Sequence, residues 1–133
     1  MRVDLRSFNN NQFDFIVWAN SPPIIEDIYC DSNQYSRGDR FVCSIEASDD
    51  SRVVNATIAW RITSGNNSSS WNIEGVGSQD GLLWWTTIEL PRFVELGDLD
   101  IMATIYDESN VSTVSVLTGI AQVRDAPAFW FGV

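Results

Sequence analysis

The chain has 133 residues, of which 44% are hydrophobic, so it is long enough for one domain with a single core. Its 8 basic residues are all arginines, 18 residues are acidic, the net charge is −10, and there is no histidine. This charge argues against nucleic-acid binding, and the missing imidazole excludes Ser-His-Asp catalysis and ordinary histidine zinc sites. No apolar run approaches the roughly 20 residues of a membrane-spanning helix.

The first predicted strand lies near the N-terminus, where apolar residues alternate from Phe13 to Trp18 before a proline-marked junction. A similar junction, Asp125-Ala126-Pro127, follows the last predicted strand. Such junctions at one-domain spacing are typical of tandem repeats. We therefore predict a sandwich domain over residues 20–125 and an aromatic tail or linker over 126–133. Residues 1–19 are either the last strand of a preceding repeat or an added or swapped edge strand of this domain.

Between these junctions the hydrophobic period is two. Alternation predicts strands over residues 40–47, 54–63, 82–90 and 99–105, and a β-branched segment predicts a last strand over 111–123. Turn-forming residues separate these segments, and no window has a helical period. The sequence therefore predicts an all-β fold: a two-sheet antiparallel sandwich of about seven strands, plus an extra N-terminal strand.

The alternation also predicts which side chains face the core. In the strand at 54–63 the even positions, beginning with Val54, face inward and Ala59 lies on the wet face. In the strand at 82–90, Trp84 faces the core and Trp85 faces the other side. The predicted core includes Phe41, Ile45, Ile58, Trp60, Trp84, Ile88, Ile101 and Ile105.

Acidic side chains gather in two predicted turns. Asp49 and Asp50 follow the strand at 40–47, and Asp107 and Glu108 follow the strand at 99–105. These turns lie at the same end of a sandwich, so the four carboxylates are weak candidates for a calcium site, which needs many oxygen ligands. No Asp-x-Asp-x-Asp-Gly loop is present. The preferred interpretation is a solvated acidic end, with no cofactor or metal and no catalytic residue.

The chain has 6 tryptophans, and two of them fall on predicted core faces. The others are candidates for a binding surface or an interface, because tryptophan is enriched at interfaces and exposed indole rings stack on sugars. These candidates are Trp18, Trp71, Trp85 and Trp130.

Several segments together resemble a known family. The stretch from Gly97 to Asp107 resembles the E–F corner and F strand of immunoglobulin-like domains. Ser36-Arg37-Gly38-Asp39 resembles the lead-in to their strand B, and Ile58-Ala59-Trp60 resembles strand C with its core tryptophan. The order and spacing are most similar to the PKD-like and other Ig-like modules repeated in prokaryotic surface proteins. The resemblance covers residues 20–125 and implies an immunoglobulin-like sandwich that serves as a spacer, an adhesion unit or part of a surface layer.

Two positions depart from antibody-type domains. Leu99 replaces the aromatic residue of the corner, and Ile101 stands where the F-strand cysteine would be, so Cys43 has no partner of that type. A disulfide, if one forms, joins Cys30 to Cys43 and ties strands A and B within one sheet. A disulfide and four N-glycosylation patterns, such as Asn110-Val111-Ser112, favour an extracellular location.

From these observations we predict a non-catalytic structural or adhesive module of a longer exported cell-surface protein. It would act through sheet faces and edge strands, with other protein domains or a second copy as partners through the N-terminal strand. The alternative is a carbohydrate-binding module that uses Trp71 and Trp85. Deletion of residues 1–19 is expected to cause aggregation or to dissociate a dimer.

Overall fold

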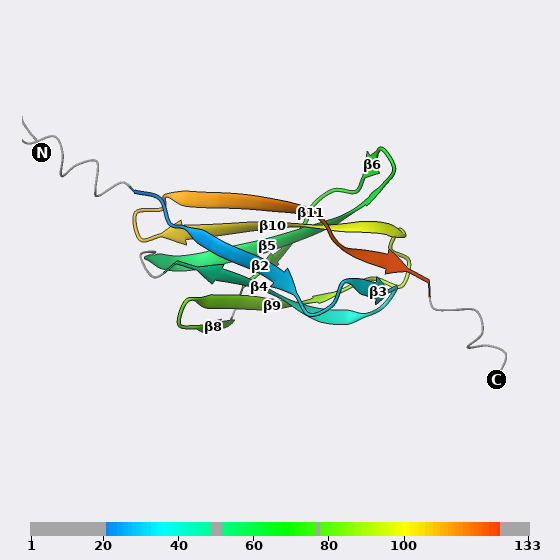
Figure 1. Cartoon of the computed structure of the whole chain (residues 1–133), viewed down its shortest axis with the longest axis horizontal. Coiled ribbons are helices and arrows are strands. Elements are labelled where there is room, and N and C mark those ends of the chain that lie inside the picture. The colour runs from blue at the N-terminus through cyan, green and yellow to red at the C-terminus, as the bar shows by residue number, and fades with distance from the viewer. Residues whose placement is uncertain (1–20, 49–51, 77, 126–133) are drawn as a thin grey trace, which may run out of the picture.

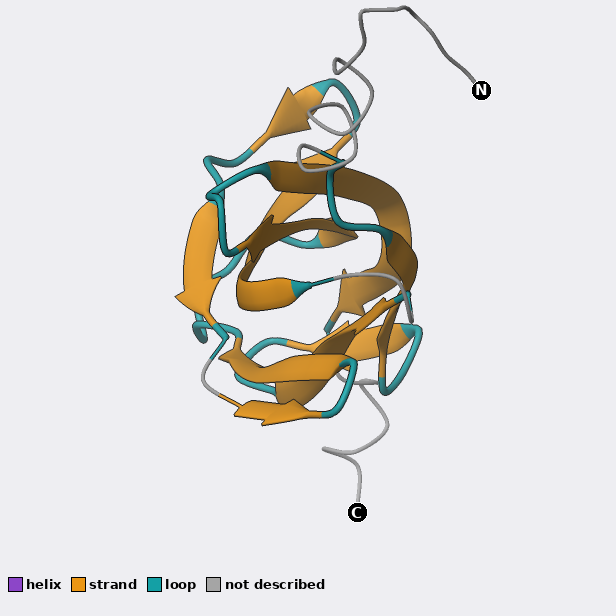
Figure 2. Cartoon of the chain, turned by 90° about the vertical axis from the view of Figure 1, so that its left-hand side faces the viewer, coloured by secondary structure: helices purple, strands orange, loops and turns teal. Residues whose placement is uncertain are grey.

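The computed structural model describes residues 21–48, 52–76 and 78–125, which contain strands, turns and loops (Figures 1 and 2). The strands are β2 (Ile25–Cys30), β3 (Gln34–Ser36), β4 (Arg40–Ala47), β5 (Val53–Ser64), β6 (Asn67–Ser68), β7 (Asn72–Gly75), β8 (Ser78–Asp80), β9 (Leu83–Glu89), β10 (Gly97–Asp107) and β11 (Ser112–Arg124). One sheet has the order β3-β11-β10-β5-β6, with β7 also paired to β5, and the other has the order β2-β4-β9-β8. No helix of the described part is long and apolar enough to cross a membrane.

The predicted all-β sandwich is confirmed. The long strands β4, β5, β9, β10 and β11 occupy the predicted segments, with β10 extended at both ends. Sequence reasoning missed β6, β7 and β8 because strands of two to four residues are too short to show an alternation. It also missed β3, which pairs with the end of β11 in parallel rather than antiparallel orientation.

The core lies between the two sheets. β4 and β9 contribute side chains from one sheet, and β5, β10 and β11 contribute them from the other. All eight residues of the predicted core are at most 6% exposed: Phe41, Ile45, Ile58, Trp60, Trp84, Ile88, Ile101 and Ile105. The indole nitrogen of Trp84 is buried without a hydrogen-bond partner in the described part of the chain.

One prediction about β5, for Val54, is wrong, and the prediction for Ala59 is right about the direction of its side chain but wrong about its exposure. Val54 is 55% exposed because Tyr106 pairs with Asn55 while Asp107 pairs with Val53, so that Val54 is the extra residue of a bulge. Val53 packs against the core instead. Ala59 does point to the outer face, but it is 3% exposed, because this small side chain lies between larger neighbours on β10 and β7.

The chain crosses from one sheet to the other between β2 and β3. Cys30 and Cys43 are paired across β2 and β4 and are joined by a disulfide. Beyond it, the Asp31 carboxylate accepts hydrogen bonds from the Tyr35 hydroxyl (2.8 Å) and from the backbone N–H of Val42 (3.1 Å). Burial, and then the hydrogen bond to Asp31, raise the pKa of Tyr35, so its hydroxyl stays protonated and fixes the crossover.

The proposed N-terminal strand, residues 1–19, and the tail, residues 126–133, lie outside the described residues. Their assignment as a preceding repeat, an edge strand or a linker stays a prediction.

Candidate functional site

The sheet of β11, β10, β5 and β7 carries three rows of outward side chains that have no formal charge. The strand register defines these rows, because side chains alternate between the two faces of a sheet. We call this set the uncharged face. Its members are Ile73, Ala59, Met102 and Val116 in the first row, Gly75, Thr57, Thr104 and Val114 in the second, and Asn55, Tyr106 and Ser112 in the third.

Several apolar side chains of the uncharged face are open to solvent. Ile73 is 72% exposed, Val114 is 54% exposed and Val116 is 45% exposed. The chain as a whole carries a net charge of −10, so a face without charge contrasts with the rest of the molecule. Such a face can be dehydrated without removing water from ions, which suits it to contact with another macromolecule.

Strand β11 also leaves part of its backbone edge unpaired. β3 pairs with Gln122–Arg124 alone, and no strand of the described part is paired with residues 112–121 on the side away from β10. A contact there is made through a side chain, the Thr113 hydroxyl, which donates a hydrogen bond to the Pro23 carbonyl just before β2. The run from Ser109 to Val123 contains no charged residue and no proline. Charged residues and proline are what usually prevent an edge strand from pairing with another chain. This edge can therefore accept a strand from another chain.

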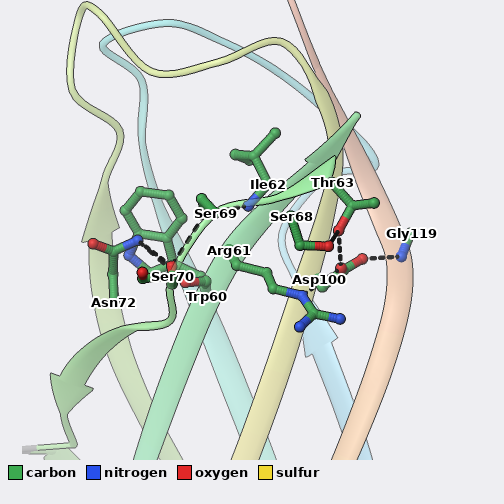
Figure 3. Close-up of polar contacts among 10 residues, drawn as sticks. All are labelled: Trp60, Arg61, Ile62, Thr63, Ser68, Ser69, Ser70, Asn72, Asp100 and Gly119. Atoms are coloured by element: carbon green, nitrogen blue, oxygen red, sulfur yellow. Dashed lines mark hydrogen bonds and ion pairs between the residues drawn. The ribbon is translucent and has the colours of Figure 1, made fainter. Parts of the chain in front are cut away.

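A buried carboxylate marks one end of the uncharged face (Figure 3). Asp100 is 2% exposed, and its Oδ2 accepts hydrogen bonds from Thr63 Oγ1 (2.7 Å) and Arg61 Nε (3.0 Å). Its Oδ1 accepts one from the backbone N–H of Gly119 (2.9 Å). Ser68 Oγ lies 2.8 Å from Thr63 Oγ1 and is the donor, since the Thr63 proton goes to Asp100. One carboxylate thus links β5, β10 and β11, and β6 through Ser68.

The bulge in β11 explains how Gly119 reaches Asp100. Leu99 pairs with Ala121 but Ile101 pairs with Leu117, so three residues of β11 lie opposite Asp100. Gly119 has a φ of 65°, a left-handed conformation that favours glycine. The bulge therefore aims a backbone N–H at the carboxylate, and Asp100 holds the bulge in place.

The electrostatics of this site follow from its partners. Burial by itself raises the pKa of Asp100, but hydrogen bonds from Thr63, Arg61 and Gly119, with the charge of Arg61, outweigh it. The pKa of Asp100 therefore lies below its usual range, and the residue is ionised at neutral pH. Trp71 covers the same site, because the guanidinium carbon of Arg61 lies 4.3 Å from its ring centroid, within the range of a cation–π interaction.

The other sheet has an aromatic row on its outer face. The register aligns Tyr29 on β2, Ser44 on β4 and Trp85 on β9. Tyr29 is 42% exposed, Trp85 is partly exposed and Ser44 is 7% exposed between them. The structure does not bring Trp71 and Trp85 together, since they lie on the outer faces of different sheets.

The remaining predicted site residues lie at the turn between β10 and β11 or outside the described residues. Trp18, Trp130, Asp49 and Asp50 are outside the described residues. The Asp107 carboxylate accepts hydrogen bonds from the backbone N–H groups of Ser109 and Val111 in its own turn. Glu108 Oε1 lies 3.9 Å from Arg52 Nη1. Within the described ranges, no group of three or more His, Cys, Asp or Glu side chains is placed to hold a metal.

Sequence reasoning considered Asp100 only as one of several acidic side chains that could bind calcium, without a buried structural role, and it did not single out Tyr29. One signal for the first was available: an isolated glycine within a predicted strand, Gly119, indicates a bulge or a close backbone contact. Tyr29 and Trp85 are aligned on one face because β2 pairs with β4 and β4 pairs with β9. This pairing cannot be read from the sequence.

No protein-family model matches the sequence, and no curated protein is significantly similar to it. Among solved structures, the fold is similar to that of a Niemann-Pick type C2 protein from the Japanese carpenter ant, with a TM-score of 0.53 and 12% sequence identity. The match covers 79% of this chain and 95% of that chain. At this identity the likeness shows the fold alone. Together with the order of the strands, it makes the chain an immunoglobulin-like β-sandwich, as predicted.

Proposed function

We propose that the chain is a non-catalytic structural and adhesive module of an exported extracellular protein, and that it associates with a second copy through the edge of β11. The observation that carries the proposal is the unpaired edge of residues 112–121, which has no charged side chain and adjoins the uncharged face. An edge of this kind is a template for pairing between chains.

Two further features support the proposal: one bears on the extracellular location and the other on a module within a longer protein. The Cys30–Cys43 disulfide is of a kind that forms and persists in oxidising compartments. β2 begins and β11 ends at opposite ends of the molecule, an arrangement that suits a unit repeated along a longer chain (Figure 1).

A second copy fits the edge for reasons of symmetry and charge. Two β11 edges pair antiparallel about a two-fold axis, so each copy offers the other the same surface. Copies with a net charge of −10 repel each other, and the repulsion is weakest where charges are absent. In such a dimer Val114 and Val116 of both copies lie on one continuous sheet face, which buries part of their exposed area.

A charge on β11 tests this proposal. Val116→Asp is expected to weaken self-association at least about tenfold, because it brings like charges close to the two-fold axis. The variant should remain folded, since Val116 points to solvent. Sedimentation equilibrium across a range of protein concentrations measures the dissociation constant. Thr87→Asp is the matched control, an exposed strand threonine on the other sheet, and should associate like the parent chain.

The other possible occupant of the edge is this chain's own N-terminal segment. A chain that is monomeric at all concentrations, but dimerises or aggregates once residues 1–19 are deleted, would show that this segment covers the edge and would overturn the second-copy proposal. A parent chain and a Val116→Asp variant with the same dissociation constant would also contradict it.

A further inference from the structure

The outer face of the β2-β4-β9 sheet carries two aromatic side chains separated by one small residue. Tyr29 and Trp85 lie two strands apart, which places their backbones about 10 Å from each other. Ser44 lies between them and is a small residue that is 7% exposed, so the two aromatic side chains stand higher than the surface that separates them. The spacing corresponds to about two sugar units of an extended polysaccharide.

The neighbouring row on the same face is acidic. Asp27, Glu46 and Leu83 are aligned across β2, β4 and β9, and Asp80 on β8 continues the row. The three carboxylates are exposed. Carboxylates accept hydrogen bonds from sugar hydroxyl groups, and they repel polysaccharides that carry carboxylate or sulfate groups.

We propose that this face binds a neutral, extended polysaccharide, with sugar rings stacked on Tyr29 and Trp85 and hydroxyl groups directed to Glu46 and its neighbours. Sugar rings present an apolar C–H face that packs on aromatic rings, and two rings on a flat sheet fit a chain laid across the strands. The acidic row selects against anionic polysaccharides. This site is on the sheet opposite the β11 edge, so it goes beyond the proposed self-association and does not depend on it.

Affinity gel electrophoresis tests the site with soluble polysaccharides in the gel. The probes are hydroxyethylcellulose, mixed-linkage β-glucan and glycol chitin as neutral chains, and alginate as an anionic chain. At least one neutral probe is expected to retard the protein, and alginate is not. Trp85→Ala and Tyr29→Ala are each expected to weaken binding about tenfold, whereas Tyr29→Phe keeps the ring and most of the affinity.

Two controls make the outcome specific. Trp71→Ala removes a tryptophan from the opposite sheet and should bind like the parent chain. Thermal unfolding of each variant identifies any loss of binding that comes from misfolding, and Tyr29→Phe removes only a hydroxyl group from the proposed site. Retardation by none of the neutral probes, or equal retardation of the parent chain and a folded Trp85→Ala variant, would overturn the proposal. Val116→Asp should leave retardation unchanged, which separates this result from the test of self-association.

Discussion

Replacing Asp100 with asparagine is expected to lower the free energy of unfolding by about 3 kcal/mol. The carboxylate is 2% exposed and receives hydrogen bonds from Thr63, Arg61 and Gly119, all of which are donors. An amide supplies one acceptor oxygen and turns its NH₂ group toward another donor, and the charge of Arg61 loses its partner. The loss lies at the low end for a buried pair because Arg61 is 27% exposed and keeps some contact with water. Urea unfolding measures the change.

The matched control is Asp98→Asn. Asp98 is an exposed carboxylate on the same strand, and its contact with Gln122 is a long 3.4 Å. Its substitution should change the free energy of unfolding by less than about 0.5 kcal/mol. A D100N variant as stable as D98N would contradict the role that we assign to Asp100.

The same comparison at low pH gives a second readout of Asp100. Its folded-state pKa lies below the unfolded value of about 3.9, so its contribution to stability is complete above that pH. The contribution is lost as the pH falls through the folded-state pKa. The difference in stability between the parent chain and D100N should therefore be largest near neutral pH and shrink in acid. A difference that stays constant down to about pH 2 would show that it does not arise from the ionised carboxylate.

Removal of the disulfide by Cys30→Ala together with Cys43→Ala is expected to cost about 3 kcal/mol of unfolding free energy. The two cysteines are 13 residues apart in sequence, and the loop between them contains the crossover from one sheet to the other. Without the bond, the unfolded chain regains the freedom of that loop, while the folded chain still holds the crossover through Asp31.

A reducing agent provides the control for this prediction. It should lower the urea midpoint of the parent chain to near that of the double variant and leave the double variant unchanged. A parent chain whose midpoint does not respond to reduction would contradict the assigned contribution of the disulfide.

The core of the fold was predictable from the sequence because it depends on a local period. In β4, β9 and β10, alternate positions such as Ile45, Ile88 and Ile101 are apolar, and a strand buries every second side chain. The prediction failed at Val54, where an extra residue interrupts the period. That bulge is defined by the pairing of β5 with β10, which a local pattern does not contain.

The candidate sites were less predictable because each of them depends on strand register. Asp100 and Arg61 both look like ordinary polar positions on a wet face, yet the pairing of β10 with β5 makes them direct neighbours and a bulge in β11 supplies a third partner. Trp85 was identified as an outward tryptophan, but the aromatic residue aligned with it on the same face, across Ser44, is Tyr29 rather than Trp71. The charge-free run in β11 was visible in the sequence, whereas its unpaired edge required the sheet order.

Backbone hydrogen exchange of the full chain at low and high protein concentration tests most directly whether the β11 edge joins two copies. If it does, amides within residues 112–121 that face the edge become slower to exchange as the concentration rises, while those of β2 and β4 keep their rates. Exchange in β11 that is independent of concentration, or protection that arises on the opposite sheet instead, would contradict a module that associates through this strand.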